Sequence, residues 1–259
     1  MIARISALGH VGARWLSRFG SLARFLLVTL GAWASLPQAG RRVVRRIFLN
    51  QVWFTAIQAI PLIVMLSGIL SFLVIAQAVR ELGQIGATEL IGTLMVIAIV
   101  RELGPLLTAL TVAGRSGTAI AAELATNRVM GEIDALEGMG IDPVHYLVLP
   151  RFLGAICSVF GLIILFDIVA VLAGFGAAVT NGMTATRYFD IVLQSIAFRD
   201  VWLSVAKGII FGMVIGTVPA FYGLRAGKAA TQVPVAAGQA VVVSIVGIFL
   251  LSVVFVMLS

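Results

Sequence analysis

Residues 90–114 read LIGTLMVIAIVRELGPLLTALTVAG, an apolar run that two opposite charges and a Gly-Pro pair interrupt near its middle. A run of this length reaches the roughly 20 residues that a helix needs to cross the hydrocarbon core of a bilayer. It therefore predicts a transmembrane helix that carries Arg101 and Glu102. Similar apolar runs occur at 54–79, 152–179, 201–222 and 240–258. The sequence thus predicts five spans.

The composition agrees with a membrane protein. Apolar residues make up 61% of the 259-residue chain, only 11% of the residues are charged, and the mean hydropathy is +1.11. A soluble globule needs more polar surface than this. The net charge of +7 does not indicate a nucleic-acid partner, because the basic residues do not gather on a polar domain with interleaved aromatics. We therefore expect an all-α integral membrane protein with no nucleic acid among its partners.

The basic residues set the expected orientation. Residues 1–46 hold arginines and no acid, which places the N-terminus in the cytoplasm, since cytoplasmic segments are enriched in Lys and Arg. The later connections that count as cytoplasmic hold Arg115, Arg128, Arg151, Arg225 and Lys228. The outer ones hold only Arg80, Arg187 and Arg199. Five spans then place the C-terminus on the outer side.

The chain divides into an N-terminal cytoplasmic arm, 1–52, and a five-span domain, 53–259. Within the arm, RRVVRRIF at 41–48 alternates charged and apolar pairs at helical spacing. This pattern predicts either a simple anchor or, as we prefer, an elbow helix in the membrane interface that braces the first span. The apolar run 25–36 has the length of a signal peptide. The long basic region before it favours its retention in the protein.

Four ionisable side chains fall inside the predicted spans. Arg101 and Glu102 lie in the second span, Asp167 in the third and Lys207 in the fourth. A charge at such depth costs at least ~2.5–3.5 kcal/mol on insertion scales, and it usually faces a protein interior or a wet cavity. Neighbouring helical residues diverge by about 100°. Arg101 and Glu102 should therefore each find a partner on another helix.

We hypothesise that these four residues form a buried polar network beside a transport cavity, in which Asp167 pairs with either Lys207 or Arg101. One alternative is a structural ion pair that caps a helix break at Gly104 and Pro105. Another is the proton relay of a secondary transporter. Inverted repeats would favour the relay, and none is visible in the sequence.

The connection 127–142 joins the second and third predicted spans on the cytoplasmic side. It is typical of a short amphipathic helix, with Val129, Ile133 and Leu136 on one face. Its charged residues include Arg128, Glu132, Asp134 and Glu137. An apolar stripe on a cytoplasmic helix predicts docking into the groove of a partner protein. A helix that merely lies on the anionic leaflet would be basic, and this segment is acidic.

The connection 184–200 lies on the predicted outer side. Tyr188, Phe189, Val192 and Ile196 recur in it at helical spacing, which predicts a short helix between the third and fourth spans. This helix either rests on the outer leaflet or forms a landing surface for an extracytoplasmic subunit.

Several of these segments resemble one family. They are Arg101-Glu102-Leu103-Gly104-Pro105, Ala113-Gly114-Arg115-Ser116-Gly117, Ala122-Glu123-Leu124, Glu132-Ile133-Asp134-Ala135-Leu136 and Met139-Gly140-Ile141-Asp142-Pro143. Together they resemble the core of MlaE-type permeases, which work with MCE proteins. The layout is similar over residues 50–258, and the motifs are most specific over 100–151. One departure is the last span, where 247–250 lacks the acid that some relatives carry.

The resemblance implies a homodimeric permease bound to two ABC ATPase subunits and to a periplasmic MCE-domain assembly. Such a complex in the bacterial inner membrane moves phospholipids or similar lipids between that membrane and the cell envelope, and ATP and Mg bind to the partner ATPase. The resemblance also makes 127–142 the coupling helix that seats in the ATPase, with Arg128, Val129, Glu132, Ile133, Leu136 and Glu137 as its candidate contacts. It implies that Arg101, Glu102 and Lys207 occupy the positions of the family's buried charges.

No constellation in the sequence suggests bond-breaking chemistry. His10 and His145 lie far apart, Cys157 falls inside the third predicted span, and no Walker motif occurs. We therefore expect no enzymatic activity, metal site or cofactor in this chain itself. A proton-coupled secondary transporter that uses the intramembrane charges is the alternative function, and a membrane scaffold is a third.

Overall fold

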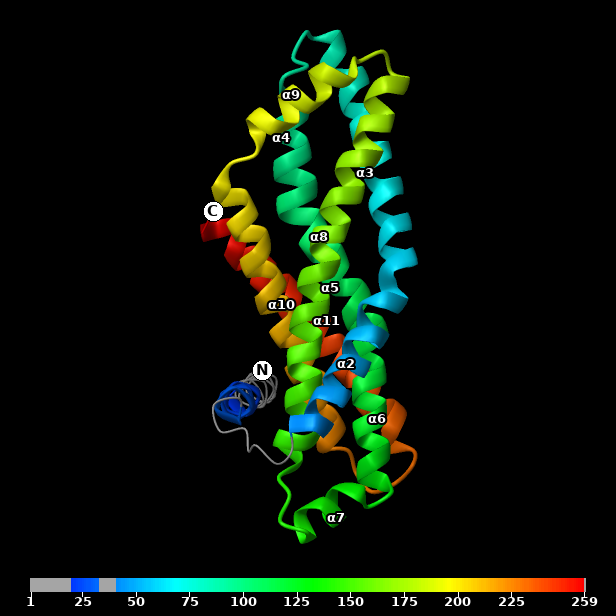
Figure 1. Ribbon diagram of the computed structural model, residues 1–259, viewed down its shortest axis with the longest axis vertical. Helices are drawn as coiled ribbons and strands as arrows, with labels where there is room; N and C mark the ends of the chain where they lie inside the picture. Colours follow the sequence, from blue (N-terminus) through cyan, green and yellow to red (C-terminus); the bar gives the residue numbers. More distant parts are fainter. Residues whose placement is uncertain (1–19, 33–40, 259) are drawn as a thin grey trace, which may run out of the picture.

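The protein is a bundle of long helices, described by a computed structural model over residues 20–32 and 41–258 (Figure 1). Five helical segments are long and apolar enough to cross a membrane: Arg42–Gln84, Leu90–Val129, Val144–Thr180, Phe198–Leu224 and Gln232–Leu258. A shorter apolar helix, Gly20–Ala32, precedes them, and no strand occurs in the described ranges. The predicted all-α membrane fold with five spans is confirmed. Arg4, Arg14 and Arg18 of the predicted arm lie outside the described residues.

The first span is longer than hydropathy predicts, because the amphipathic helix runs into it. Helix α2 (Arg41–Thr55) is followed by the 3-10 turn η2 (Ile57–Ala59) and by α3 (Ile60–Gln84). Pro61 lies in the first turn of α3, where its missing N–H has no helical partner to lose. The helix expected at 41–48 is therefore the first part of a longer, bent helical segment.

Two π-helical segments interrupt the α-helical hydrogen bonding of the second span. It consists of α4 (Leu90–Leu94), π-helical η3 (Met95–Leu103), α5 (Gly104–Val112), π-helical η4 (Ala113–Gly117) and α6 (Thr118–Val129). The break expected at Gly104 and Pro105 takes the form of a change from π- to α-helical bonding, and the chain stays helical there. π-Helical segments are rare and often occur at functional sites, so the presence of Arg101 and Glu102 in η3 makes them candidate functional residues.

The remaining elements follow along the long axis of the molecule. They are α7 (Glu132–Gly138), π-helical η5 (Val144–Val148), α8 (Leu149–Thr180), α9 (Ala185–Ser195), α10 (Phe198–Leu224) and α11 (Gln232–Leu258). Figure 1 shows α7 at one end of this axis and α9 at the other. Helix α8 is central, since α2, α3 and α10 all pack against it. The short helices thus cap opposite ends of a bundle built around α8.

Glycines let α10 approach α8 closely. A Cβ at Gly212 would lie 2.6 Å from Ile156 Cα, and one at Gly216 would lie 2.8 Å from Phe152 Cα. Both obstructing atoms belong to the backbone of α8, so no side chain can move aside to make room. Small residues at helix contacts are the usual means by which membrane helices pack tightly. These glycines therefore fix the separation of α8 and α10.

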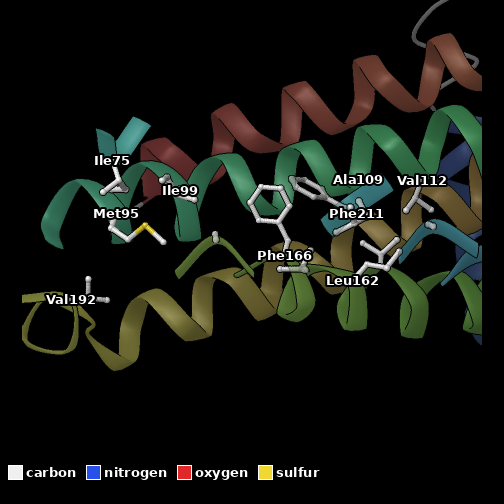
Figure 2. Packing of buried hydrophobic residues seen from close by; sticks show 14 of the residues in the cluster. Ile75, Met95, Ile99, Ala109, Val112, Leu162, Phe166, Val192 and Phe211 are labelled. Carbon is white, nitrogen blue, oxygen red and sulfur yellow. The ribbon is translucent and has the colours of Figure 1, made fainter. Parts of the chain in front are cut away.

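The largest buried cluster joins α3, η3, α5, α8, α9 and α10 (Figure 2). Figure 2 shows Phe166 of α8 and Phe211 of α10 among its large side chains. The hydroxyls of Ser67 and Ser71 on α3 donate to the carbonyls of Phe166 and Ala170, each at 2.6 Å. Such bonds add to the van der Waals packing that holds membrane helices together. The core therefore fixes α3 and α10 to opposite parts of α8.

Candidate functional site

Two ion pairs join the π-helical part of the second span to α10. The ammonium of Lys207, only 1% exposed, lies 2.7 Å from Glu102 Oε2, and Arg101 Nη1 lies 3.5 Å from Asp200 Oδ1. Asp200 and Lys207 are seven residues apart and so share one face of α10. The two charges of η3 are thus neutralised by two charges of α10, and we call these four residues the ion-pair cluster.

Pro105 supplies an acceptor to this cluster. In an α-helix the N–H of residue 105 would donate to the carbonyl of Arg101, but proline has no N–H. The ammonium of Lys207 donates to that carbonyl at 2.7 Å instead. A buried ammonium needs its donors satisfied. Pro105 thus has no N–H that could compete with Lys207 for this oxygen.

The structure brings three of the four predicted network residues together and replaces the fourth. Arg101 and Glu102 approach each other at 3.5 Å, but the Arg101 Nε in this contact makes no hydrogen bond. Each finds its other partner on α10, as the sequence indicated. The partner of Arg101, however, is Asp200. The sequence missed this residue because the apolar run was taken to begin at 201.

Asp200 belongs to the first turn of α10, where its side chain has two contacts. Its Oδ2 accepts a hydrogen bond from the N–H of Ala197 at 3.2 Å, while Oδ1 faces Arg101. An acidic residue at this helical position commonly bonds back to the residue that precedes the helix. That local signal is the one by which the sequence could have included Asp200 in the span.

Asp167 pairs with neither Lys207 nor Arg101, and no ion pair of Asp167 occurs among the described residues. Its Oδ2 accepts a 3.4 Å hydrogen bond from Ser204, and its Oδ1 is buried without a hydrogen-bond partner. The prediction that Asp167 balances a cation is therefore wrong. The reason is geometric, because the Lys207 ammonium is directed to Glu102 and to the Arg101 carbonyl.

Gly104 makes room for the Asp167 side chain. A Cβ at Gly104 would lie 2.8 Å from Asp167 Oδ1 and 3.1 Å from Phe166 Cδ1. Any larger residue at this position would push the carboxyl group or the ring away. The Gly-Pro pair thus lies at two contacts between helices. Pro105 has no N–H that could compete with Lys207 of α10 for the Arg101 carbonyl, and Gly104 leaves space for the Asp167 side chain of α8.

Another ion pair, in which only the arginine is buried, lies toward the α7 end of the bundle. Arg151 on α8 is only 5% exposed, and its Nη2 lies 2.6 Å from Glu123 Oε1 on α6. Its Nη1 also donates to the carbonyl of Leu147 at 2.6 Å. The sequence placed Arg151 in a connection, where a charge has a low cost, so it gave no reason to expect burial. This pair ties the second span to the third.

The connection after the second span differs from the predicted single helix over 127–142. Gly131 adopts φ of 78°, a left-handed conformation that glycine adopts readily, so α6 ends at Val129 and α7 begins anew at Glu132. Val129 therefore does not continue the face of Ile133 and Leu136. Arg128 belongs to α6 as well.

The predicted exposed apolar stripe is also wrong. Ile133 is only 2% exposed and belongs to a cluster with Ile120 and Leu124, against which Leu136 is partly buried. These side chains hold α7 to the body of the protein and are not available to a partner. The large apolar side chains exposed in this connection are those of Met130, Met139 and Ile141. Glu132 and Glu137 are exposed beside them.

Asp134 ties α7 to two other segments. Its Oδ2 lies 2.6 Å from the Lys228 ammonium in the loop between α10 and α11, and its Oδ1 lies 3.1 Å from Arg128 Nη1 at the end of α6. The hydrogen bond and the charge of Lys228, with a smaller contribution from Arg128, hold the pKa of the Asp134 carboxyl below its ordinary value. The α7 segment therefore contacts the second span and the α10–α11 loop together.

At the opposite end, α9 packs on the protein through Tyr188 and Val192 of the predicted outer helix. The Tyr188 hydroxyl donates to the carbonyl of Val171 at 3.1 Å, and burial raises its pKa to about 12. Arg187 Nη2 donates to Thr88 Oγ1 at 2.7 Å. Gly92 of α4 admits Ile191, whose carbonyl would lie 2.5 Å from a Cβ there. Helix α9 is thus a fixed cover over α4.

Comparison with known sequences assigns the chain to a family. The sequence model of permease MlaE matches residues 48–258, which include the ion-pair cluster, four of the five candidate spans in full and the first one from residue 48 onward. The chain belongs to the MlaE permease family. It is therefore the multi-pass membrane permease of an ABC transporter, a class in which the ATPase is a separate subunit. The resemblance inferred from the motifs of residues 101–143 is confirmed.

Three relatives illustrate the breadth of the MlaE permease family. A probable ABC transporter permease of Rickettsia typhi is 32% identical over 197 residues, which are 76% of each chain. One from Synechocystis is 31% identical over 81% of this chain and 80% of its own. The intermembrane phospholipid transport system permease protein MlaE of Haemophilus influenzae is 26% identical over 85% of this chain and 84% of its own. The similarity thus extends over most of each relative.

Proposed function

We propose that this MlaE-family permease moves phospholipids or similar lipids between the bacterial inner membrane and the cell envelope. The observation that carries the proposal is the similarity to the phospholipid transport permease of Haemophilus influenzae over 85% of this chain. Its topology would place the N-terminus and α7 in the cytoplasm, and α9 and the C-terminus in the periplasm. That assignment is supported by the arginines in the first two turns of α2 and by the acid-free N-terminal arm.

The ATPase would bind at the α7 end. We define the α7 docking surface as the exposed side chains of Met130, Glu132, Glu137, Met139 and Ile141. Flexible methionines suit a surface that adapts to a groove on a partner. Because Ile133 and Leu136 are packed inward, a push on this surface would reach the body of the protein through their cluster. ATP and Mg would bind to the ATPase subunit.

The push would reach the second and the fourth spans. The cluster of Ile133 contains Ile120 of α6 and Ala220 of α10, and Asp134 contacts the α10–α11 loop through Lys228. Movement of α6 and α10 would then act on the ion-pair cluster, which joins the same two spans deeper in the bundle through η3 and α10. We place the lipid path next to these segments.

A second copy of the chain would complete the path. Helix α11 has only 17% of its most apolar window buried, the lowest share among the five candidate spans in the described chain. From residue 242 onward its exposed side chains are apolar, including Val242, Phe249 and Val253. An MCE-domain subunit on the periplasmic side would receive or deliver the lipid.

The test is purification of the complex from native membranes without crosslinking, followed by identification of its components. The proposal expects a stoichiometric ATPase, two copies of this chain and co-purified phospholipid. A variant with Met139→Glu should lose the ATPase, whereas Val242→Glu on α11 should keep it. Recovery of the protein alone would count against the proposal. So would a variant that combines Met139→Glu with further substitutions in the α7 docking surface and still retains the ATPase.

Proton-coupled transport is the second candidate, and the unpaired oxygen of Asp167 is the observation that favours it. A carboxyl group buried without a counter-charge is a common feature of proton pathways. The two functions differ in energy source. Transport in proteoliposomes that requires a proton gradient and no ATPase would support the second candidate, and transport that requires the ATPase and survives a protonophore would exclude it.

A further inference from the structure

A cavity of about 380 Å³ lies between α2, α6 and α8. Its polar walls include Asn50, Glu123 and Arg151, and its apolar walls include Ile47, Phe54 and Ala119. The size falls within the range of small-molecule sites, and such sites combine an apolar wall with a few fixed polar groups. The ion-pair cluster does not line this cavity, so the site is separate from the one described above.

Packing fixes the walls of the cavity. Gln51 of α2 sits against Gly154 of α8, where an added Cβ would lie 2.8 Å from Gln51 Cγ. Arg115 of η4 holds the end of α2 by donating to the Phe54 carbonyl at 3.4 Å and to Gln58 Oε1 at 2.6 Å. The space between α2 and α6 is therefore part of the folded protein and does not require a ligand to open it.

The outward side of α2 belongs at a membrane surface. Leu49 and Trp53 are exposed there, and the same helix exposes Arg42, Arg45 and Arg46. Helices that expose apolar and basic side chains together lie in the interface between headgroups and acyl chains, and Trp is enriched at that level. The cavity on the inward side of α2 thus opens at the depth of lipid headgroups.

The charges at this opening are of both signs. The Glu123 side chain is 56% exposed, and Arg151 engages its Oε1 at 2.6 Å and its Oε2 at 3.4 Å from the buried side. A carboxylate can accept about four hydrogen bonds, so Glu123 retains capacity toward the open side. Arg46 is exposed one turn before the wall residue Asn50 on α2, a spacing that puts the two residues on neighbouring parts of one helix face. An ammonium group would suit Glu123, and a phosphate would suit an arginine.

We propose that this cavity binds the headgroup of an amine-bearing zwitterionic phospholipid from the leaflet in which α2 lies, with phosphatidylethanolamine as the simplest example. The ammonium pairs with Glu123, the phosphate with arginine of α2, and the glycerol end of the acyl chains lies against Ile47 and Phe54. The lipid joins α2 to α6 and thereby holds the elbow at the base of the first span. This inference does not rest on the proposed function, because the site needs neither ATP nor a transported substrate.

The experiment uses the full-length protein in nanodiscs that contain a phosphatidylethanolamine analogue with a photoreactive group on the headgroup. After irradiation, peptides that cover 41–55 and 118–129 should carry the label. Ala119→Phe fills the cavity and should lower this labelling about tenfold, which corresponds to a loss of about 1.4 kcal/mol of binding free energy. The matched control is Leu73→Phe, which adds a ring at an exposed apolar position of α3 and should leave labelling unchanged.

Competition identifies what is recognised. Unlabelled phosphatidylethanolamine should reduce the labelling. Phosphatidylglycerol should not, because it lacks the amine, and soluble glycerophosphoethanolamine should not, because it lacks the acyl chains that hold a lipid in the membrane. Should Ala119→Phe not fold, Asn50→Trp closes the exposed rim instead and should have the same effect. Equal labelling of the cavity-filling variant and the control, or equal competition by phosphatidylglycerol or by the soluble headgroup, would overturn the proposal.

Discussion

Replacement of Lys207 by methionine tests whether the ion-pair cluster is a coupled unit. Lys207 is only 1% exposed and its ammonium lies 2.7 Å from Glu102, whose side chain is 25% exposed. Removal of one member of a buried pair leaves the other charge unpaired and costs roughly 3–5 kcal/mol. The partial exposure of Glu102 places the expected loss at the lower end, about 3 kcal/mol. The measurement is unfolding of the purified protein in detergent by denaturant or heat.

The double variant Lys207→Met with Glu102→Gln makes the prediction specific. If the two side chains stabilise each other, the double variant should be more stable than the sum of the two single losses predicts, by about 2 kcal/mol. Arg80→Met at the exposed end of α3 is the control and should change little. Single losses below about 1 kcal/mol, or strictly additive losses, would refute the reasoning.

Three further changes probe other parts of the structure. Pro105→Ala restores an N–H that competes with Lys207 for its backbone acceptor, so transport should slow while stability changes by no more than about 1 kcal/mol; an unchanged transport rate would contradict this. Gly212→Ala places a Cβ 2.6 Å from backbone and should destabilise the fold by about 1–3 kcal/mol, whereas Gly161→Ala, with open space around it, should not. Asp134 has a lowered pKa in the folded protein, so its tether stabilises the protein above the ordinary value of 3.8 and is lost as the pH falls further. Asp134→Asn should therefore melt below the wild type at pH 7, and the difference should vanish in acid.

The spans were predictable because a helix that crosses the hydrocarbon core needs a long apolar run, and few other structures need one. The five runs in the sequence correspond to the five long helices, and the charges of Arg101 and Glu102 inside one run correctly indicated partners on another helix. Span limits were less accurate, since polar residues at helix ends can still be buried by tertiary packing. Asp200 was missed for this reason, one residue outside the run.

Two of the wrong expectations have a common cause. Helical periodicity says which residues share a face, but it does not say whether that face meets the protein or a partner. Ile133 and Leu136 share a face as expected, and the structure turns that face inward. Asp167 was likewise expected to pair with a cation because the four charges balance. The actual partners depend on distances between helices, which cannot be read from sequence spacing.

ATP-dependent movement of phospholipid by the reconstituted complex is the most direct test of the central claim. The permease, its ATPase and the MCE-domain subunit would be placed in proteoliposomes with a fluorescent phospholipid, and transfer of the lipid to an acceptor would be followed on addition of ATP and Mg. Our account predicts transfer that stops without hydrolysable ATP and falls sharply in the Lys207→Met variant when that variant is folded. Transfer at the same rate without ATP, or its absence in a fully assembled and hydrolysing complex, would contradict it.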